Sequence, residues 1–269
     1  MSVNSYYRGM DLQAVLPDDS AEMAPERLVE MAIAAEEIGY ETAWLPDHLL
    51  PPEPFGPTYG GVYEPLVTLA FLAARTSRIR LGTSVLVLPL RSPYVVAKQA
   101  ATLHRLSGER VTLGIGAGWD AAEFQAVGRE FGERGRRTDE GLAIMRRLFA
   151  GEHDGGVFEP RLRAPLPIMV GGTTERALRR AALLGDEWQG LGLDGPGFAR
   201  AVSRLRELSD RPVRVGTRIH WGGGGTELGN AVRSARDLVA AGAETLAVSF
   251  GAEKGTENRM AEFAAAELG

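Results

Sequence analysis

The chain has 269 residues, of which 44% are hydrophobic and 24% charged, and its formal net charge is −5. This composition predicts a folded globular protein, and the acidic balance disfavours nucleic acid or an anionic membrane surface as a partner. Because the chain contains no cysteine, disulfides, thiolate nucleophiles and cysteine-ligated metals are excluded.

Short apolar runs alternate with amphipathic helical patterns from one end of the chain to the other. We expect strands over residues 10–17, 41–48, 78–89, 109–116, 166–172, 187–193, 211–220 and 244–250. We expect helices over 25–39, 65–77, 93–108, 139–149, 173–185, 197–209 and 227–242, and a last one toward the C-terminus. Strands that alternate with helices predict parallel βαβ units, because parallel neighbours need a crossover connection.

Eight such units in a chain of this length close most simply as a (β/α)8 TIM barrel, an α/β fold of about 250 residues. The alternative is an open, doubly wound parallel sheet. We see no linker or change in composition, so we expect a single barrel domain over residues 1–269. The start of the chain shows no secretory signal and no run reaches 18 apolar residues, so we expect a soluble cytoplasmic protein.

A glycine-rich loop follows the fourth expected strand, in the stretch VTLGIGAGWDAAEF over residues 111–124. A dinucleotide-binding fingerprint has a third glycine and follows the first strand of its fold. Here Trp119 takes the position of the third glycine, and the stretch follows the fourth expected strand. The stretch is therefore not such a fingerprint. At the carboxyl-terminal mouth of a barrel, Gly116 and Gly118 would let backbone N–H groups approach a ligand closely.

A second loop of this kind is VGGTTERAL, residues 170–178, with paired glycines, a threonine suited to cap the next helix and a capping glutamate. Two such loops on neighbouring strands favour a phosphate-bearing ligand, although glycines at strand ends can also serve only to make turns. For the run WGGGG at 221–225 we favour a role in making turns over a role in binding a ligand, and at most it forms a flexible lid.

The four histidines are His48, His104, His153 and His220. His48 ends the second expected strand beside Asp47, where an imidazole could bind a ligand or carry a proton, although it could also be structural. His220 ends the seventh strand and could reach the same mouth. No metal-binding or serine-hydrolase motif is present. A barrel with few acid–base groups predicts that a cofactor supplies the reactivity.

Four segments together resemble the luciferase-like monooxygenase superfamily. They are GYETAWLPDH at 39–48, the stretch from TSRIRLG to GAGW at 76–119, FGERGRRTDEGLAIMRRLF at 131–149 and PLPIMVGGTTERALRRAALLGDEW at 165–188. The resemblance implies a bacterial-luciferase-like (β/α)8 barrel that binds FMN or the deazaflavin coenzyme F420 at its mouth. It favours the F420-dependent oxidoreductase branch.

The resemblance also implies roles for individual residues. His48, with Asp47 beside it, would be catalytic and would lie near the reactive ring, which a non-proline cis peptide between Ser84 and Val85 would support. The cofactor phosphate and tail would be seated by the two loops, through Gly116, Ala117, Gly118, Val170, Gly171, Gly172, Thr173 and Thr174. Trp119 and Trp44 are candidates for the substrate wall, with a core role favoured for Trp44.

Two departures from the relatives bear on the substrate. Trp119 stands where F420-dependent sugar-phosphate dehydrogenases have an acidic residue, which disfavours that substrate class, and the segment between residues 149 and 165 is shorter. We expect a hydride transfer between F420 and a small organic substrate. The alternatives are an FMN-dependent two-component monooxygenase served by a separate reductase, and a non-catalytic flavin- or deazaflavin-binding protein. The resemblance further implies a homodimer, for which the apolar helix over 65–77 could serve.

Overall fold

The structure, a computed structural model, describes residues 10–18, 20, 22–51, 61, 63–152 and 155–266. Its strands are β1 (Asp11–Val15), β2 (Thr42–Leu45), β3 (Arg80–Thr83), β4 (Leu86–Val87), β5 (Val111–Gly116), β6 (Ile168–Gly171), β7 (Glu187–Leu191), β8 (Arg214–His220) and β9 (Thr245–Ser249). All of their pairings are parallel, in the order β3-β2-β1-β9-β8-β7-β6-β5-β4, and a further pairing of β3 with β5 closes the ring. The expected (β/α)8 barrel is confirmed, and the open sheet is excluded.

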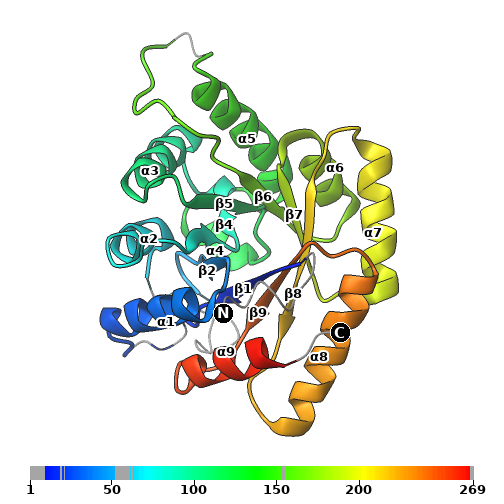
Figure 1. The fold of residues 1–269 in the computed structure, drawn as a ribbon. Helices are drawn as coiled ribbons and strands as arrows, with labels where there is room; N and C mark the ends of the chain where they lie inside the picture. Colours follow the sequence, from blue (N-terminus) through cyan, green and yellow to red (C-terminus); the bar gives the residue numbers. More distant parts are fainter. Residues whose placement is uncertain are drawn as a thin grey trace.

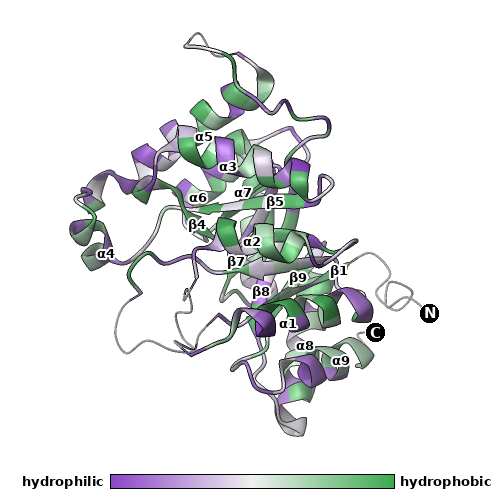
Figure 2. Cartoon of the chain, turned by 90° about the vertical axis from the view of Figure 1, so that its left-hand side faces the viewer, coloured by the Kyte–Doolittle hydropathy of each residue, from purple (hydrophilic) through white to green (hydrophobic). Residues whose placement is uncertain are grey.

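Helices surround this ring of strands (Figure 1). They are α1 (Pro25–Ile38), α2 (Pro65–Ala73), α3 (Pro93–Leu106), α4 (Ala121–Ala126), α5 (Arg134–Ala150), α6 (Glu175–Leu184), α7 (Gly195–Leu208), α8 (Gly225–Ala240) and α9 (Thr256–Ala265). Two short 3₁₀ turns, η2 (Leu88–Leu90) and η3 (Phe131–Glu133), complete the described elements. The helix α4 stands apart from the larger helices in Figure 2.

The helix α1 illustrates how the sequence places these elements. Pro25 occupies its first turn, where a missing N–H costs nothing, and Gly39 ends it at φ 106°, a conformation that suits glycine. Leu28, Ala32 and Ala35 are buried at helical spacing, so one face packs on the barrel. Both colours of the hydropathy scale accordingly appear along α1 in Figure 2.

The stretch 78–89 was expected to form one strand, and the structure divides it into β3 and β4. The Ser84 N–H still donates to the Leu45 carbonyl of β2, at 2.8 Å. Beyond that point Leu86 pairs with Ile115 of β5, so the chain has left β2 for its other neighbour. The peptide bond between Ser84 and Val85 is cis, as the resemblance implied.

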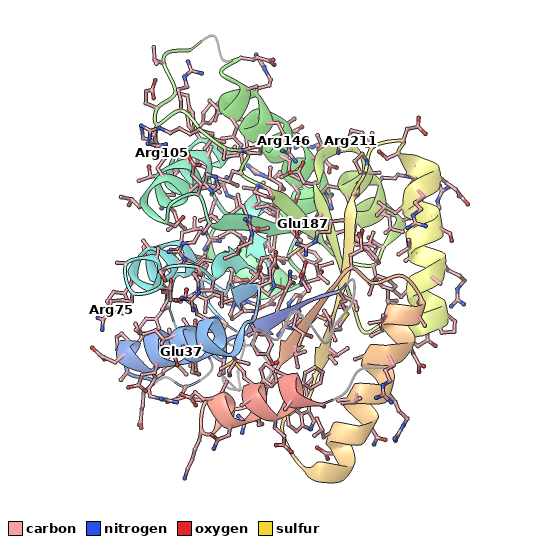
Figure 3. The ribbon with its side chains drawn as sticks, in the orientation of Figure 1. Glu37, Arg75, Arg105, Arg146, Glu187 and Arg211 are labelled. Atoms are coloured by element: carbon pink, nitrogen blue, oxygen red, sulfur yellow. The ribbon has the colours of Figure 1, made fainter. Side chains whose placement is uncertain are left out.

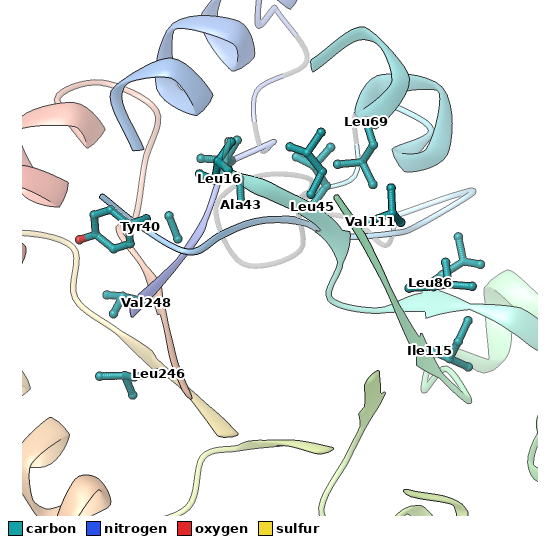
Figure 4. Packing of buried hydrophobic residues seen from close by; sticks show 14 of the residues in the cluster. Leu16, Tyr40, Ala43, Leu45, Leu69, Leu86, Val111, Ile115, Leu246 and Val248 are labelled. Atoms are coloured by element: carbon teal, nitrogen blue, oxygen red, sulfur yellow. The ribbon is translucent and has the colours of Figure 1, made fainter. Parts of the chain in front are cut away.

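Two apolar layers hold the barrel together. The larger layer lies between strands and helices and includes Leu45 and Leu69, both labelled in Figure 4. The smaller one lies inside the ring, where Trp44 packs with Val15, Met169 and Ala247, and Val85 packs against it. Because strand residues alternate between the two layers, the layer that a residue joins shows which way its side chain points.

The amino-terminal end of the barrel interior is filled with ion-paired side chains. Arg214 of β8 donates to Asp11 and, at 3.0 Å, to Glu41, and it lies 3.9 Å from Glu187. Figure 3 places Glu187 among the strands, unlike Arg75 and Glu37 at the periphery. Burial raises the pKa of Glu187, and the charge of Arg214 opposes that shift. A ligand site is therefore expected at the opposite, carboxyl-terminal end, which we call the mouth.

Among the helices that the structure describes, none is long and apolar enough to cross a membrane.

Candidate functional site

His48 at the end of β2 is paired with a residue that lies 75 positions later in the chain. Its Nδ1 is 3.4 Å from Oε2 of Glu123 in α4, and the backbone N–H groups of Leu49 and Leu50 donate to Oε1 of the same carboxylate. Glu123 is only 3% exposed. One buried carboxylate thus holds both the imidazole and the loop that follows it.

This arrangement determines which ring nitrogen of His48 carries a hydrogen. Burial by itself would raise the pKa of Glu123, but the hydrogen bonds from His48, Leu50 and Leu49 outweigh it and lower the pKa below its usual value. Glu123 is therefore a carboxylate at neutral pH, and a carboxylate only accepts hydrogen bonds. Nδ1 of His48 then carries the hydrogen in this contact, and a neutral imidazole has its acceptor at Nε2.

Trp119 lies beside His48 at the mouth. The two ring centroids are 5.8 Å apart and the planes meet at 80°, an edge-to-face contact. Trp119 is 57% exposed, and Leu191 at the end of β7 is 62% exposed. Large apolar side chains exposed at the end of a barrel offer walls for a ligand that is itself partly apolar.

Asp47, expected to act with His48, has different surroundings. Its Oδ2 accepts from the Val87 N–H and from Arg91, each at 2.7 Å, and its Oδ1 accepts from Arg91 at 2.7 Å. Arg91 also lies 3.6 Å from Glu64, the residue that caps α2. Burial raises the pKa of Asp47, while Arg91 and the Val87 N–H oppose that shift. Both carboxylate oxygens are thus engaged in holding β4 against β2.

Val85 enters the barrel interior between two glycines. A Cβ built on Gly116 would lie 2.3 Å from Val85 Cγ2, and one on Gly171 would lie 2.6 Å from Val85 Cγ1. Glycine at both positions therefore lets β5 and β6 approach Val85. The neighbouring Ser84 hydroxyl donates to Oε1 of Gln189 in β7, at 2.7 Å, across the interior.

The two glycine loops lie at the carboxyl ends of β5 and β6, as expected. Gly118 has φ 78° and Gly172 has φ 125°, a region that favours glycine. Ala117 is half-buried, whereas Thr173 and Thr174 are exposed.

Thr174 caps α6 by accepting from the Ala177 N–H at 3.2 Å, as the sequence predicted. The prediction that a glutamate takes part in the cap was wrong, because the Glu175 carboxylate instead accepts from Arg179 and Arg204. The side chain of Val170 packs in the layer between strands and helices, so only its backbone can face a ligand.

The other candidate for the substrate wall, Trp44, is buried. Trp44 is 1% exposed and donates to Oε1 of Gln13 at 2.9 Å, which is the core role that the sequence favoured. Trp221, which opens the WGGGG run, is also buried and packs against Phe250 and Phe263, so the start of the run is anchored.

The other histidines differ in position. His104 is fully buried in α3, and His153 lies outside the described residues. His220 is exposed at the end of β8, with Nδ1 3.5 Å from the Ser249 hydroxyl of β9. Within the described ranges, no group of three or more His, Asp or Glu side chains could hold a metal ion.

Sequence reasoning missed Glu123 and Arg91. The pattern Asp120-x-x-Glu123 is typical of a helix start in which both side chains cap locally. Asp120 does so, accepting from the Ala122 N–H at 3.0 Å, but Glu123 reaches across to the loop after β2. Nothing local in the sequence distinguishes these two outcomes, because the partners are far apart along the chain.

Comparison with known proteins gives one family. A family model described as luciferase-like monooxygenase matches residues 9–249. An F420-dependent glucose-6-phosphate dehydrogenase of Kineococcus radiotolerans is 35% identical over 204 residues, which are 69% of this chain and 59% of that protein.

Two solved structures share the fold. An F420-dependent secondary alcohol dehydrogenase in complex with an F420-acetone adduct superposes with a TM-score of 0.79 at 14% identity, covering 94% of this chain and 98% of that one. The FMN complex of the oxygenating constituent of 3,6-diketocamphane monooxygenase from Pseudomonas putida gives 0.72 at 16% identity, covering 97% and 96%. At these identities the likeness establishes the barrel and not the chemistry.

Proposed function

The chain belongs to the luciferase-like monooxygenase family, and within it we propose an oxidoreductase that transfers a hydride between coenzyme F420 and a small organic substrate at the mouth of the barrel. The observation that carries the proposal is the pairing of His48 with Glu123 beside the exposed ring of Trp119. The choice of F420 is supported by the 35% identical relative that is named as F420-dependent.

The residues at the mouth fit a flat, anionic cofactor. Gly116 and Gly171 keep side chains away from Val85, which is itself partly exposed, so an apolar surface faces the mouth between Trp119 and Leu191. The turn at Gly118 and the start of α6 offer backbone N–H groups to a phosphate, whereas the N–H of Gly172 itself donates to the Gln189 carbonyl at 3.1 Å. We assign the ring to Ser84 and Val85 and the tail to residues 116–118 and 170–174.

When bound, the deazaflavin supplies the hydride, and the chain supplies placement and proton control. The carboxylate of Glu123 keeps Nδ1 of His48 protonated, so a neutral imidazole presents its acceptor at Nε2 and a protonated one donates there. His48 can therefore bind a hydroxyl or carbonyl oxygen in either redox direction and pass a proton to it. Asp47 acts in this proposal as a positioning residue, through Arg91 and Val87.

The cofactor assignment is tested by titrating the purified chain with F420 and, separately, with FMN, while tryptophan fluorescence is recorded. We expect selective tight binding of F420. The variant Trp119→Phe should lose a large part of the quenching, because Trp119 is the exposed indole at the mouth. Preference for FMN would contradict the choice of cofactor, and binding of neither would contradict the function.

The role of His48 is tested with His48→Ala and His48→Gln. We expect turnover to fall by about 10²–10⁴-fold in the alanine variant, the range for loss of a proton-transferring group. His220→Ala is the matched control, because His220 is an exposed histidine on a different strand of the same mouth. Unchanged turnover and cofactor affinity in His48→Ala would remove the residue from the mechanism.

A second function is an FMN-dependent monooxygenase served by a separate reductase. It is favoured by a 4-hydroxyprotoasukamycin monooxygenase that is 34% identical over 157 residues, 54% of this chain and 41% of that protein. Oxygen uptake separates the two, since a deazaflavin does not activate oxygen. An oxygenated product formed from substrate, oxygen and reduced FMN, above the level of an enzyme-free control, would establish this function and overturn the first.

We further propose that the chain forms a homodimer through α2 and α3. These neighbouring helices expose large hydrophobic side chains, Val67, Phe71, Tyr94 and Val95. Light scattering after size exclusion tests the proposal. We expect Phe71→Arg to give monomers, whereas Leu183→Arg, at an exposed leucine of α6, should leave the dimer intact. A dimer that survives Phe71→Arg together with Val95→Arg would exclude this face.

A further inference from the structure

Strand β8 directs a row of polar side chains into the barrel. Val215 and Ile219 pack in the layer between strands and helices, so the alternate residues Arg214, Gly216 and Arg218 face the interior. A Cβ on Gly216 would lie 1.9 Å from the Thr245 hydroxyl of β9, which agrees with that direction. Arg218 is therefore two residues, or about 7 Å, below the last residue of the strand at the mouth.

The two arginines of this row have different surroundings. Arg214 is paired with Asp11, Glu41 and Glu187 at the amino-terminal end. Arg218 makes no hydrogen bond or ion pair with any residue in the described part of the chain. The residues level with it on the adjacent strands are Leu191 and Ala247, which are both apolar.

Arg218 is half-buried, and no carboxylate in the described part of the chain pairs with it. Desolvation lowers the pKa of its guanidinium to about 10, whereas the carboxylates around Arg214 raise the pKa of that residue. Arg218 thus remains cationic at neutral pH in a place where an uncompensated charge is costly. A ligand anion would compensate it.

We propose that Arg218 binds a carboxylate of the substrate, so that the substrates are small organic acids with an apolar body. The inference rests on the proposed function and adds a substrate class to it. One guanidinium carries one positive charge, and its planar arrangement of N–H donors matches a carboxylate in a bidentate ion pair. The exposed side chains of Leu191 and Trp119 then face the apolar body. The cofactor tail is assigned to β5 and β6, whereas Arg218 lies on β8.

The test uses the full chain saturated with oxidised F420 and, in parallel, without cofactor. Crotonate and cinnamate are titrated against their methyl esters, and dissociation constants are taken from fluorescence. We expect the wild type to bind each acid at least tenfold more tightly than its ester. Arg218→Met should remove that preference while leaving ester affinity within twofold, and Arg218→Lys should retain part of it.

Arg206→Met is the matched control, because Arg206 is an exposed arginine in the last turn of α7 with no ion pair in the described structure. It should behave like the wild type. A second readout is the thermal midpoint without ligand. Arg218→Met should raise it, because a half-buried charge that has no partner among the described residues is removed. A lowered midpoint together with unchanged acid preference would make Arg218 structural and overturn the proposal.

The outcomes separate this proposal from the proposed function. Two results would overturn the substrate class alone while F420 still binds. In the first, the preference for the acids survives Arg218→Met. In the second, the wild type shows no preference for the acids. Loss of F420 affinity in Arg218→Met with acid binding unchanged assigns the arginine to the cofactor's anionic groups and also overturns it. If the wild type binds neither F420 nor FMN, the function fails, and the cofactor-free titration still decides on Arg218.

Discussion

The packing of Val85 between two glycines predicts a specific pattern of stabilities. In Gly171→Ala the new Cβ would lie 2.6 Å from Val85 Cγ1, well inside van der Waals contact, and a β-branched side chain held in the barrel interior cannot rotate away freely. We expect this overpacking to lower the free energy of unfolding by about 1–3 kcal/mol. Val85→Ala removes both methyl groups and should cost about 1–2 kcal/mol through the lost burial.

The double variant is the decisive case. Once the methyl groups of Val85 are gone, the nearest remaining atom to the new Cβ is the Cβ of residue 85 at 3.7 Å, an ordinary contact. Val85→Ala with Gly171→Ala should therefore cost less than the sum of the single changes, by about 1–2 kcal/mol of coupling. Urea unfolding, monitored by tryptophan fluorescence, gives the free energy of unfolding of the wild type, the two single variants and the double variant. Gly132→Ala, where an added Cβ meets nothing within 4 Å, should be nearly neutral. Strictly additive costs would refute the packing argument.

Three further predictions follow from the buried polar groups. Glu123→Ala should lower the free energy of unfolding by about 1–3 kcal/mol, because His48 and two partly solvated backbone N–H groups lose their acceptor. Glu123→Gln should cost less, and equal costs of the two variants in urea unfolding would contradict this. Asp47→Ala should cost about 3 kcal/mol, the lower end for a broken buried ion pair, because Arg91 loses its two 2.7 Å bonds and keeps the longer contacts to the Val87 carbonyl and Glu64. A cost below about 1 kcal/mol would show that Arg91 finds water. Burial lowers the pKa of His104 below its ordinary 6.5, so the unfolded chain binds the proton more readily and stability falls as the pH drops below about 6.5. The free energy of unfolding should therefore differ less between pH 7.5 and pH 5.5 in His104→Asn than in the wild type.

The barrel follows from the pattern of apolar runs and helices along the chain. Eight apolar runs each followed by a helical pattern leave little choice, because parallel neighbours need crossover helices, and the structure places a strand in every expected range. Local signals also determined the ends of elements, such as Gly39 after α1 and Thr174 before α6, because caps depend on residues three or four positions away.

Which side chains meet at the mouth depends on how the ring of strands closes in space. The sequence placed His48 beside Asp47, yet the partner of His48 is Glu123 and that of Asp47 is Arg91, each brought close by closure of the ring. The two arginines of β8 look alike in the sequence, and only the barrel interior shows that Arg214 is paired at one end while Arg218 is not. The physical reason is that a hydrogen bond or an ion pair acts over a few ångströms in space, whatever the separation along the chain.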